Sequence, residues 1–94
     1  MATPSSAELR QTILQLAAER GASKSICPSE VARHLAGSDE KKWRLLMKPV
    51  RAEAVDLAQA GDVTITRKGK PVDPTDFRGV YRIRIGGTHA TEAD

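Results

Sequence analysis

Apolar and polar positions in the first twenty residues repeat at the spacing of an amphipathic helix. Leu9, Ile13 and Ala17 fall on one face, and most of the residues between them are polar. Ser5 can cap this helix, and Gly21 supplies the left-handed residue that ends it. The pattern therefore predicts a first helix that packs through its apolar stripe.

A second, shorter helix is predicted over residues 28–37. Pro28 suits the first helical position, because its missing N–H costs nothing there. Cys27 occupies the cap position as a small buried hydrophobe, and Glu30 stands where a capping-box carboxylate belongs. The run 25–27 is too short to stand alone, so we expect it to pair at the edge of a later hairpin.

Residues 39–60 carry two helical patterns that meet at a proline. Acidic residues lead and basic residues follow before Lys48, an order that suits one or two turns of helix. Pro49 disfavours helix at Lys48 and would clash with the carbonyl four residues earlier in a continuous helix. We expect two helices, with Pro49 opening the second, which runs to Ala60. A single kinked helix is the alternative.

The pattern after residue 62 has a period of two, as strands do. Residues 63–66 alternate between apolar residues and threonines, and residues 81–85 alternate between apolar residues and arginines. Each strand is thus expected to have one dry face and one polar face, as in a hairpin lying against helices. The connection 67–80 is about twice the length of an ordinary hairpin turn. Within it, Phe77 is the aromatic residue expected to be exposed.

This order of elements predicts an α+β fold of the winged-helix type, with three to four helices and a small antiparallel β-hairpin wing. The chain has 94 residues, enough for one domain with a single apolar core and no deep catalytic cleft. We assign the domain to residues 8–85, with a flexible N-terminus over residues 1–7 and a flexible tail over residues 86–94.

Positive charge is concentrated in the second half of the chain. The formal net charge is +3, but residues 41–85 hold eleven basic and five acidic side chains, whereas residues 1–40 hold four basic and five acidic ones. The long helix and the hairpin therefore favour a polyanionic partner. The alternative is a chance asymmetry, as in many basic proteins.

Signals for catalysis, metal binding and membrane insertion are missing from the sequence. His34, His89 and Cys27 do not form a metal-ligand spacing, and no glycine-rich phosphate loop follows a predicted strand. We expect no enzyme, no cofactor and no metal. No apolar run reaches about 18 residues, and the chain does not start like a secretory signal. With one cysteine, a reduced, cytoplasmic setting is the default expectation.

Five segments together resemble a known family: Ile26–Ala32, Trp43–Met47, Pro49–Arg51, Arg67–Pro74 and Gly79–Arg84. They are similar, over roughly residues 8–85, to small bacterial winged-helix proteins catalogued as domain of unknown function 3253. The resemblance implies the winged-helix fold and a bacterial source, and it carries over no catalytic or ligand-binding residue. The broader superfamily implies DNA binding as a tendency.

In such a fold the helix that ends at Ala60 would present its N-terminal half to a DNA groove, and the hairpin would follow the backbone. The candidate DNA-binding residues are Lys48 and Arg51 on the helix, with Arg67, Lys68, Lys70, Arg78, Arg82 and Arg84 on the hairpin.

Double-stranded DNA is accordingly the expected partner, bound mainly through backbone contacts. Glu53 and Asp56 add negative charge on or near the DNA-facing side of the helix, which favours an alternative. On that alternative the chain is a protein–protein interaction module on the same scaffold, without DNA binding. Pairing as a homodimer and binding of another protein both stay open.

Overall fold

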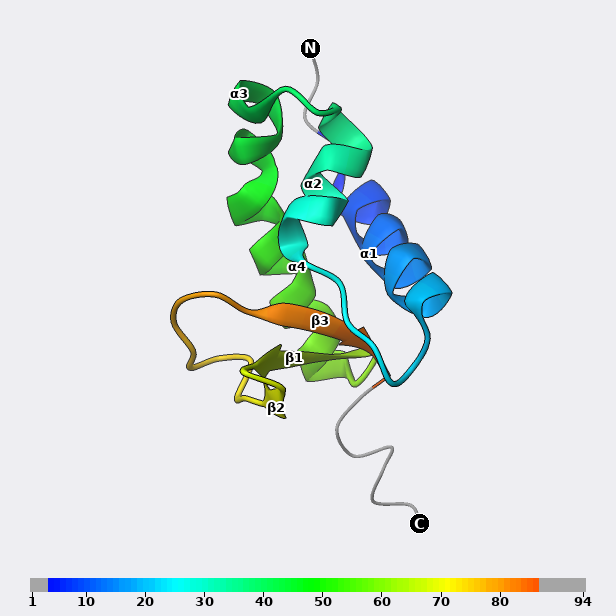
Figure 1. Ribbon diagram of the computed structural model, residues 1–94, viewed down its shortest axis with the longest axis vertical. Coiled ribbons are helices and arrows are strands. Elements are labelled where there is room, and N and C mark those ends of the chain that lie inside the picture. Colours follow the sequence, from blue (N-terminus) through cyan, green and yellow to red (C-terminus); the bar gives the residue numbers. More distant parts are fainter. Residues whose placement is uncertain (1–3, 87–94) are drawn as a thin grey trace.

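In the computed structural model of this protein, residues 4–86 are described, and their helices pack over one face of a small sheet (Figure 1). The elements are α1 (Ser6–Arg20), α2 (Pro28–Ala36), α3 (Glu40–Trp43), a 3₁₀ turn (Arg44–Leu46), α4 (Met47–Ala60), β1 (Val63–Arg67), β2 (Lys70–Pro71) and β3 (Arg82–Ile85). The predicted α+β class is confirmed, and the arrangement is compatible with a winged helix.

Both ends of α1 follow from local chemistry. The Ser5 hydroxyl accepts the Glu8 N–H at 3.1 Å, and the Glu8 carboxylate accepts the Ser5 N–H at 3.0 Å, so the capping box is confirmed. Gly21 ends the helix with a φ of 96° and a ψ of 160°, outside the left-handed helical region expected for it. Residues 1–3 and 87–94, including His89, lie outside the described residues.

The short segment before α2 joins the sheet, as predicted. Ile26 and Ile83 exchange two backbone hydrogen bonds, of 2.8 and 2.9 Å. The Cys27 N–H donates to the Glu30 carboxylate at 2.7 Å, which completes the predicted role of Glu30 at the start of α2. The run 25–27 is thereby fixed along the outer edge of β3.

The helical path over residues 40–60 is continuous but changes its winding. α3 leads through the 3₁₀ turn into α4, and Leu46 at the junction has φ −89° and ψ −6°. Pro49 is the third residue of α4, so the prediction that it opens the helix is wrong. The first four N–H groups of a helix have no intrahelical partner, and a proline is therefore tolerated anywhere among them.

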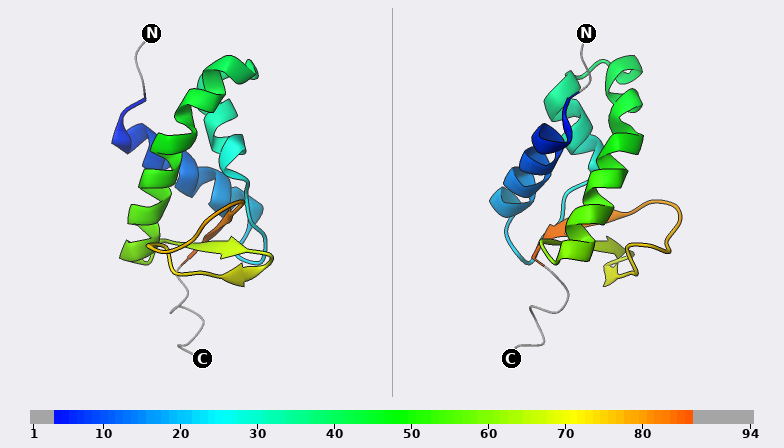
Figure 2. Two further views of the ribbon diagram at one scale, coloured as in Figure 1. Left: turned by 90° about the vertical axis from the view of Figure 1, so that its left-hand side faces the viewer. Right: turned by 180° about the vertical axis from the view of Figure 1, so that it is seen from behind.

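β1 is the central strand of a three-stranded antiparallel sheet with the order β2-β1-β3. β1 and β2 are joined by Lys68 and Gly69, with φ values of 54° and 81°, as in a two-residue hairpin turn of the primed class. The connection 67–80 was expected to be one long loop. It instead contains this tight hairpin and then the β2–β3 loop, residues 72–81 (Figure 2).

The polar face predicted for β1 is not solvated. Thr64 and Thr66 retain only 3% and 5% of their exposure. β1 is flanked by strands on both sides, and these threonines stand opposite Arg84 and Arg82 of β3. Long arginine side chains can cover a small cross-strand neighbour with their aliphatic stems. The opposite face of the sheet supplies the core, to which α1, α2 and α4 contribute.

Phe77 is buried, which corrects the expectation that it would be exposed. Its side chain is 8% accessible and meets Tyr81 edge-to-face, with ring centroids 5.1 Å apart. Tyr81 points inward, as its place in the alternating pattern predicted. The two rings form an apolar anchor inside the β2–β3 loop, so this loop is packed rather than free.

An ion pair joins α1 to α4. The Arg10 guanidinium donates to Glu53 at 2.6 Å and to Asp56 at 3.2 Å, and the Ser6 hydroxyl donates to Glu53 at 2.9 Å. The hydrogen bond from Arg10 holds the pKa of Glu53 below its ordinary value of 4.5, although burial acts in the opposite direction.

Within residues 4–86, no helix has the length and apolar character needed to cross a bilayer.

The lowered pKa of Glu53 predicts a pH dependence of stability. A carboxylate whose pKa is lower in the folded state stabilises the fold above its unfolded pKa, and this contribution is lost as pH falls through the folded pKa. We expect Glu53→Gln to lower the thermal midpoint at pH 7, and the gap to the wild type to shrink as pH falls below 4.5. Thermal scans between pH 7 and pH 3 measure both. A gap independent of pH would contradict the assignment.

The Tyr81 hydroxyl is buried and has no hydrogen-bond partner within residues 4–86, and burial raises the pKa of Tyr81 to about 12. A buried hydroxyl without a partner costs about 1–3 kcal/mol. Tyr81→Phe keeps the ring contact with Phe77 and removes this group, so we expect it to raise the free energy of unfolding by about 1 kcal/mol. Urea denaturation measures the change, and Tyr81→Leu serves as the destabilised control. A loss of stability in Tyr81→Phe would contradict the burial argument.

Candidate nucleic-acid interface

Arg51 fastens the β2–β3 loop to α4. Its guanidinium donates to the Phe77 carbonyl at 2.9 Å and lies 4.0 Å from the centre of the Phe77 ring. It also lies 5.8 Å from the centre of the Tyr81 ring. Stacking of this kind contributes about 0.5–2 kcal/mol where solvent is partly excluded. Arg51, which the sequence nominated as a DNA-binding residue, instead holds the loop.

Arg67 makes a second internal contact with the same loop. Its Nε donates to the Val80 carbonyl at 2.9 Å, and a Cβ placed on Gly79 would come within 3.0 Å of the guanidinium. Gly79 has a φ of 84°, a conformation that costs other residues about 1–3 kcal/mol. The glycine therefore leaves room for Arg67 to cross the loop.

Arg82 contacts the segment before α2, at the edge of the sheet formed by β3. It donates from Nε to the Ser25 hydroxyl at 2.7 Å and from Nη2 to the Ser25 carbonyl at 3.0 Å. It also lies 4.0 Å from the Glu30 carboxylate, which is paired with Arg20 at 2.6 Å. This network joins β3 to the ends of α1 and α2. The main role of Arg82 is therefore structural, since its side chain connects β3 to the segment before α2.

The side chains of the other five nominated cations make no hydrogen bond or ion pair with any residue among 4–86. They are Lys48 on α4, Lys68 and Lys70 at the β1–β2 turn, Arg78 in the β2–β3 loop and Arg84 on β3. Of the eight nominated residues, three therefore use their side chains inside the fold. The side chains of the other five have no partner among residues 4–86, and we call these five the free cations.

Two of these cations are exposed on elements that Arg51 connects, α4 and the β2–β3 loop. The left view of Figure 2 shows α4 and the β2–β3 loop together in front of α1. Lys48 is exposed one turn before Arg51, and Arg78 is exposed directly after Phe77, which Arg51 binds. The contact between Arg51 and Phe77 therefore fixes the position of the β2–β3 loop, and of Arg78 within it, relative to α4. Arg84 points to the outer face of the sheet.

The acidic residues of α4 are paired with an arginine of α1. Glu53 and Asp56 are turned toward α1, where Arg10 pairs with both. Glu53, which was expected to add negative charge on or near the DNA-facing side of α4, has its carboxylate held by Arg10 and Ser6. The exposed residues of α4 are Lys48, Ala52, Asp56, Gln59 and Ala60. Among them, Asp56 is paired with Arg10, whereas the Lys48 side chain has no partner among residues 4–86.

The acidic residues of the loop also leave its cations free. Asp73 accepts two hydrogen bonds from Thr75, of 2.9 Å from N–H and 2.7 Å from the hydroxyl, and these hold the pKa of Asp73 below its ordinary value of 3.8. Among residues 4–86, neither Asp73 nor Asp76 forms an ion pair. The loop therefore carries two aspartates without ion pairs beside its one arginine, Arg78.

Sequence reasoning missed two exposed apolar side chains beside these elements. Leu45 and Val80 are 76% and 82% exposed, in the 3₁₀ turn before α4 and in the β2–β3 loop. The alternation of apolar and polar residues could not predict their exposure, because each lies in a segment without regular helix or strand.

Across residues 4–86 no cluster of three His, Cys, Asp or Glu side chains could hold a metal ion.

A family model described as a protein of unknown function (DUF3253) matches residues 6–86. The chain belongs to this family. The match begins at the first residue of α1 and ends just after β3, so the DUF3253 unit contains every contact described above for the candidate interface. No curated protein matches the chain with significance. The family description names no activity, and a functional argument therefore rests on the surface chemistry.

The Arg51 clamp is open to a direct test within this DUF3253 domain. Arg51→Lys keeps the positive charge but loses the planar stack and the hydrogen bond, a change we expect to cost about 1–3 kcal/mol of unfolding free energy. Amides of residues 72–81 should also exchange faster with solvent, because the loop loses its attachment. Lys48→Met is the matched control at an exposed site and should change neither quantity. Unchanged exchange in Arg51→Lys would show that the loop is held by other contacts.

Proposed function

We propose that this protein is a winged-helix domain that binds double-stranded DNA, chiefly through its phosphate backbone. Lys48 on α4 and Arg78 on the β2–β3 loop contact the duplex together, with Lys68 and Lys70 extending the contact along the hairpin. Contacts of this kind set position and affinity but carry little sequence information.

One observation carries the proposal: five cations on α4, the hairpin and its loop have side chains without a partner among residues 4–86. Arg10 draws the acidic residues of α4 toward α1, while Lys48 and Arg78 have no acidic partner among residues 4–86. Five free cations on α4, the hairpin and its loop suit a polyanion better than a mixed protein surface. The Arg51 clamp adds pre-organisation, since less of the loop has to be ordered on binding.

The outward side of α4 argues for weak sequence preference. Ala52 offers no hydrogen bond, and Gln59 lies at the C-terminal end of the helix, away from the half that usually reads base edges. Arg51 cannot supply a bidentate contact to guanine while it holds Phe77. The domain is therefore proposed as a binder of duplex backbone rather than a reader of a defined site.

The first test is the salt dependence of duplex affinity. Each neutralised phosphate contributes about −0.9 to the slope of log affinity against log salt, so five engaged cations predict a slope of about −4.5. Fluorescence anisotropy with a labelled random duplex, from about 50 to 200 mM salt, measures it. Absence of binding at the lowest salt would remove DNA as the partner.

Neutralising the exposed cations of α4 and the loop tests the placement of the duplex. Lys48→Gln with Arg78→Gln should make the slope shallower by about 2 and weaken binding by roughly one to two orders of magnitude near 50 mM salt. The control is Gln11→Glu with Ala18→Glu, which lowers the net charge equally on the exposed face of α1. If both double variants bind alike, only the overall charge matters and the proposed placement is wrong.

The exposed Leu45 and Val80 favour a second candidate, a protein–protein interaction module on the same scaffold. Exposed apolar side chains that join into one patch mark sites of protein or membrane interaction. Two measurements distinguish the candidates. If the wild type binds no duplex, the interaction module is left as the function. If DNA is the partner, Leu45→Ser with Val80→Ser should leave duplex affinity unchanged.

A further inference from the structure

A shallow hollow lies on the outer face of the sheet, where the segment before α2 runs past β3. Its volume is about 140 Å³, and it is lined by Ser23, Lys24, Ser25, Thr66, Gly69 and Arg84. These residues come from three separate parts of the chain: the turn after α1, the β1–β2 hairpin and β3. None of the six is acidic. The hollow is therefore a concave site built from hydrogen-bond donors.

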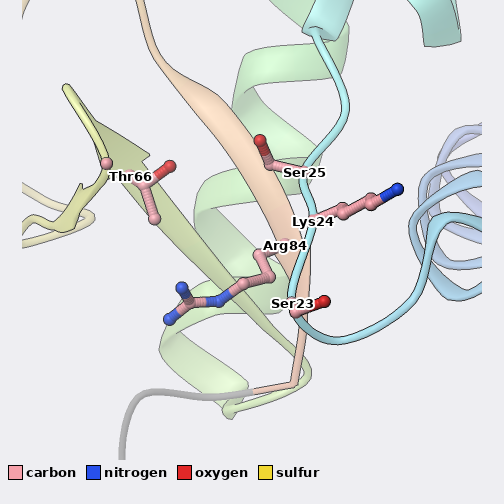
Figure 3. Close-up of a pocket in the computed structure, with 6 residues that line it drawn as sticks. Ser23, Lys24, Ser25, Thr66 and Arg84 are labelled. Carbon is pink, nitrogen blue, oxygen red and sulfur yellow. The ribbon is translucent and has the colours of Figure 1, made fainter.

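Arg84 supplies the charge of the hollow. In Figure 3 its side chain extends from β3 toward β1, on the side of the sheet where Thr66 also stands. Arg84 is half-buried and has no ion-pair partner among residues 4–86. A partly shielded guanidinium presents several N–H donors in a fixed fork, a geometry suited to a planar or tetrahedral oxyanion.

The hydroxyl groups around Arg84 are oriented to donate. The Ser25 oxygen already accepts a hydrogen bond from Arg82 at 2.7 Å, so its own proton is available for a second partner. The Thr66 hydroxyl makes no hydrogen bond within the described part of the chain. The Ser23 hydroxyl stands at the near edge, while the Lys24 ammonium points away from Arg84 (Figure 3). Three hydroxyl groups and one guanidinium thus line the same hollow.

The β1–β2 turn closes one side of the hollow. Gly69 lines it directly, and the positive φ values of Lys68 and Gly69 hold the turn in a defined conformation. Lys68 and Lys70 therefore stand on either side of the glycine, next to the site. The positive potential at the rim complements the donors inside it.

We propose that this hollow is a binding site for one phosphate group. The inference rests on the proposed function, under which the group is a backbone phosphate of the bound duplex that passes the hairpin. The chemistry needed is a single tetrahedral oxyanion, accepting from the Arg84 guanidinium and from the hydroxyls of Ser25 and Thr66. Free phosphate shares this chemistry, so it serves as the probe of the site apart from DNA.

The first measurement uses inorganic phosphate with the isotopically labelled full chain. Millimolar phosphate should shift the amide resonances of Ser25, Thr66 and Gly69 in a saturable way, and Arg84→Gln should abolish these shifts. Shifts that persist in Arg84→Gln, or an absence of saturable shifts in the wild type, would overturn the site. If Arg84→Gln does not fold, Arg84→Lys replaces it and should weaken phosphate binding several-fold, since it loses the fork.

The second measurement places the same variant in the duplex assay. Arg84→Gln should make the salt slope shallower by about 1, the share of one phosphate contact. Gln11→Glu on α1 changes the net charge by the same amount and should leave the slope unaltered. An unchanged slope in Arg84→Gln, with wild-type binding intact, would reject the hollow as a DNA contact while the proposed function stands.

The phosphate titration and the duplex assay can also give the opposite combination of results. Saturable phosphate shifts that depend on Arg84, together with no duplex binding by the wild type, would sustain the hollow as a phosphate site and refute the proposed DNA function. Thermal midpoints of each variant confirm that the fold is retained in every arm.

Discussion

The contact between Arg51 and the Phe77–Tyr81 pair is the interaction on which the shape of the candidate interface depends. A long loop between β2 and β3 would otherwise lose conformational entropy without compensation, because its backbone makes few regular hydrogen bonds. The buried rings and the guanidinium stacked 4.0 Å from Phe77 supply that compensation. Since the clamp begins on α4, the position of the loop is set relative to the helix as well as to the sheet.

Arginine serves two purposes in this small domain, and only the structure separates them. Arg51, Arg67 and Arg82 donate to backbone carbonyls or to a serine inside the fold, where a planar fork can satisfy several acceptors at once. Lysines occur at the exposed positions, such as Lys48, where a flexible, hydrated ammonium is sufficient. A count of basic residues therefore overstates the charge that is available to a partner.

Ion pairing between helices also shapes the surface potential. Arg10 reaches Glu53 and Asp56 across the α1–α4 contact, and the pair stabilises the packing while it removes negative charge from the neighbourhood of Lys48. Exposed ion pairs contribute little to stability on their own. Here the more consequential effect is on charge, because the same interaction occupies both carboxylates of α4 and leaves Lys48 without a partner among residues 4–86. Fold and electrostatics are thus linked through a single arginine.

Local patterns were enough to predict the helices, strands β1 and β3, the capping box at Ser5 and the pairing of residues 25–27 with β3, because caps, periodicity and turn residues act over a few positions. The short strand β2 was not predicted. The start of α4 was predicted two residues too late, at Pro49, because a proline fits anywhere in the first turn of a helix. The burial of Phe77, the separate uses of the arginines and the hollow around Arg84 depend on residues distant in sequence, such as Ser25 and Arg82, which are 57 positions apart. Only tertiary packing brings such groups together, and so it alone decided which charges remain free.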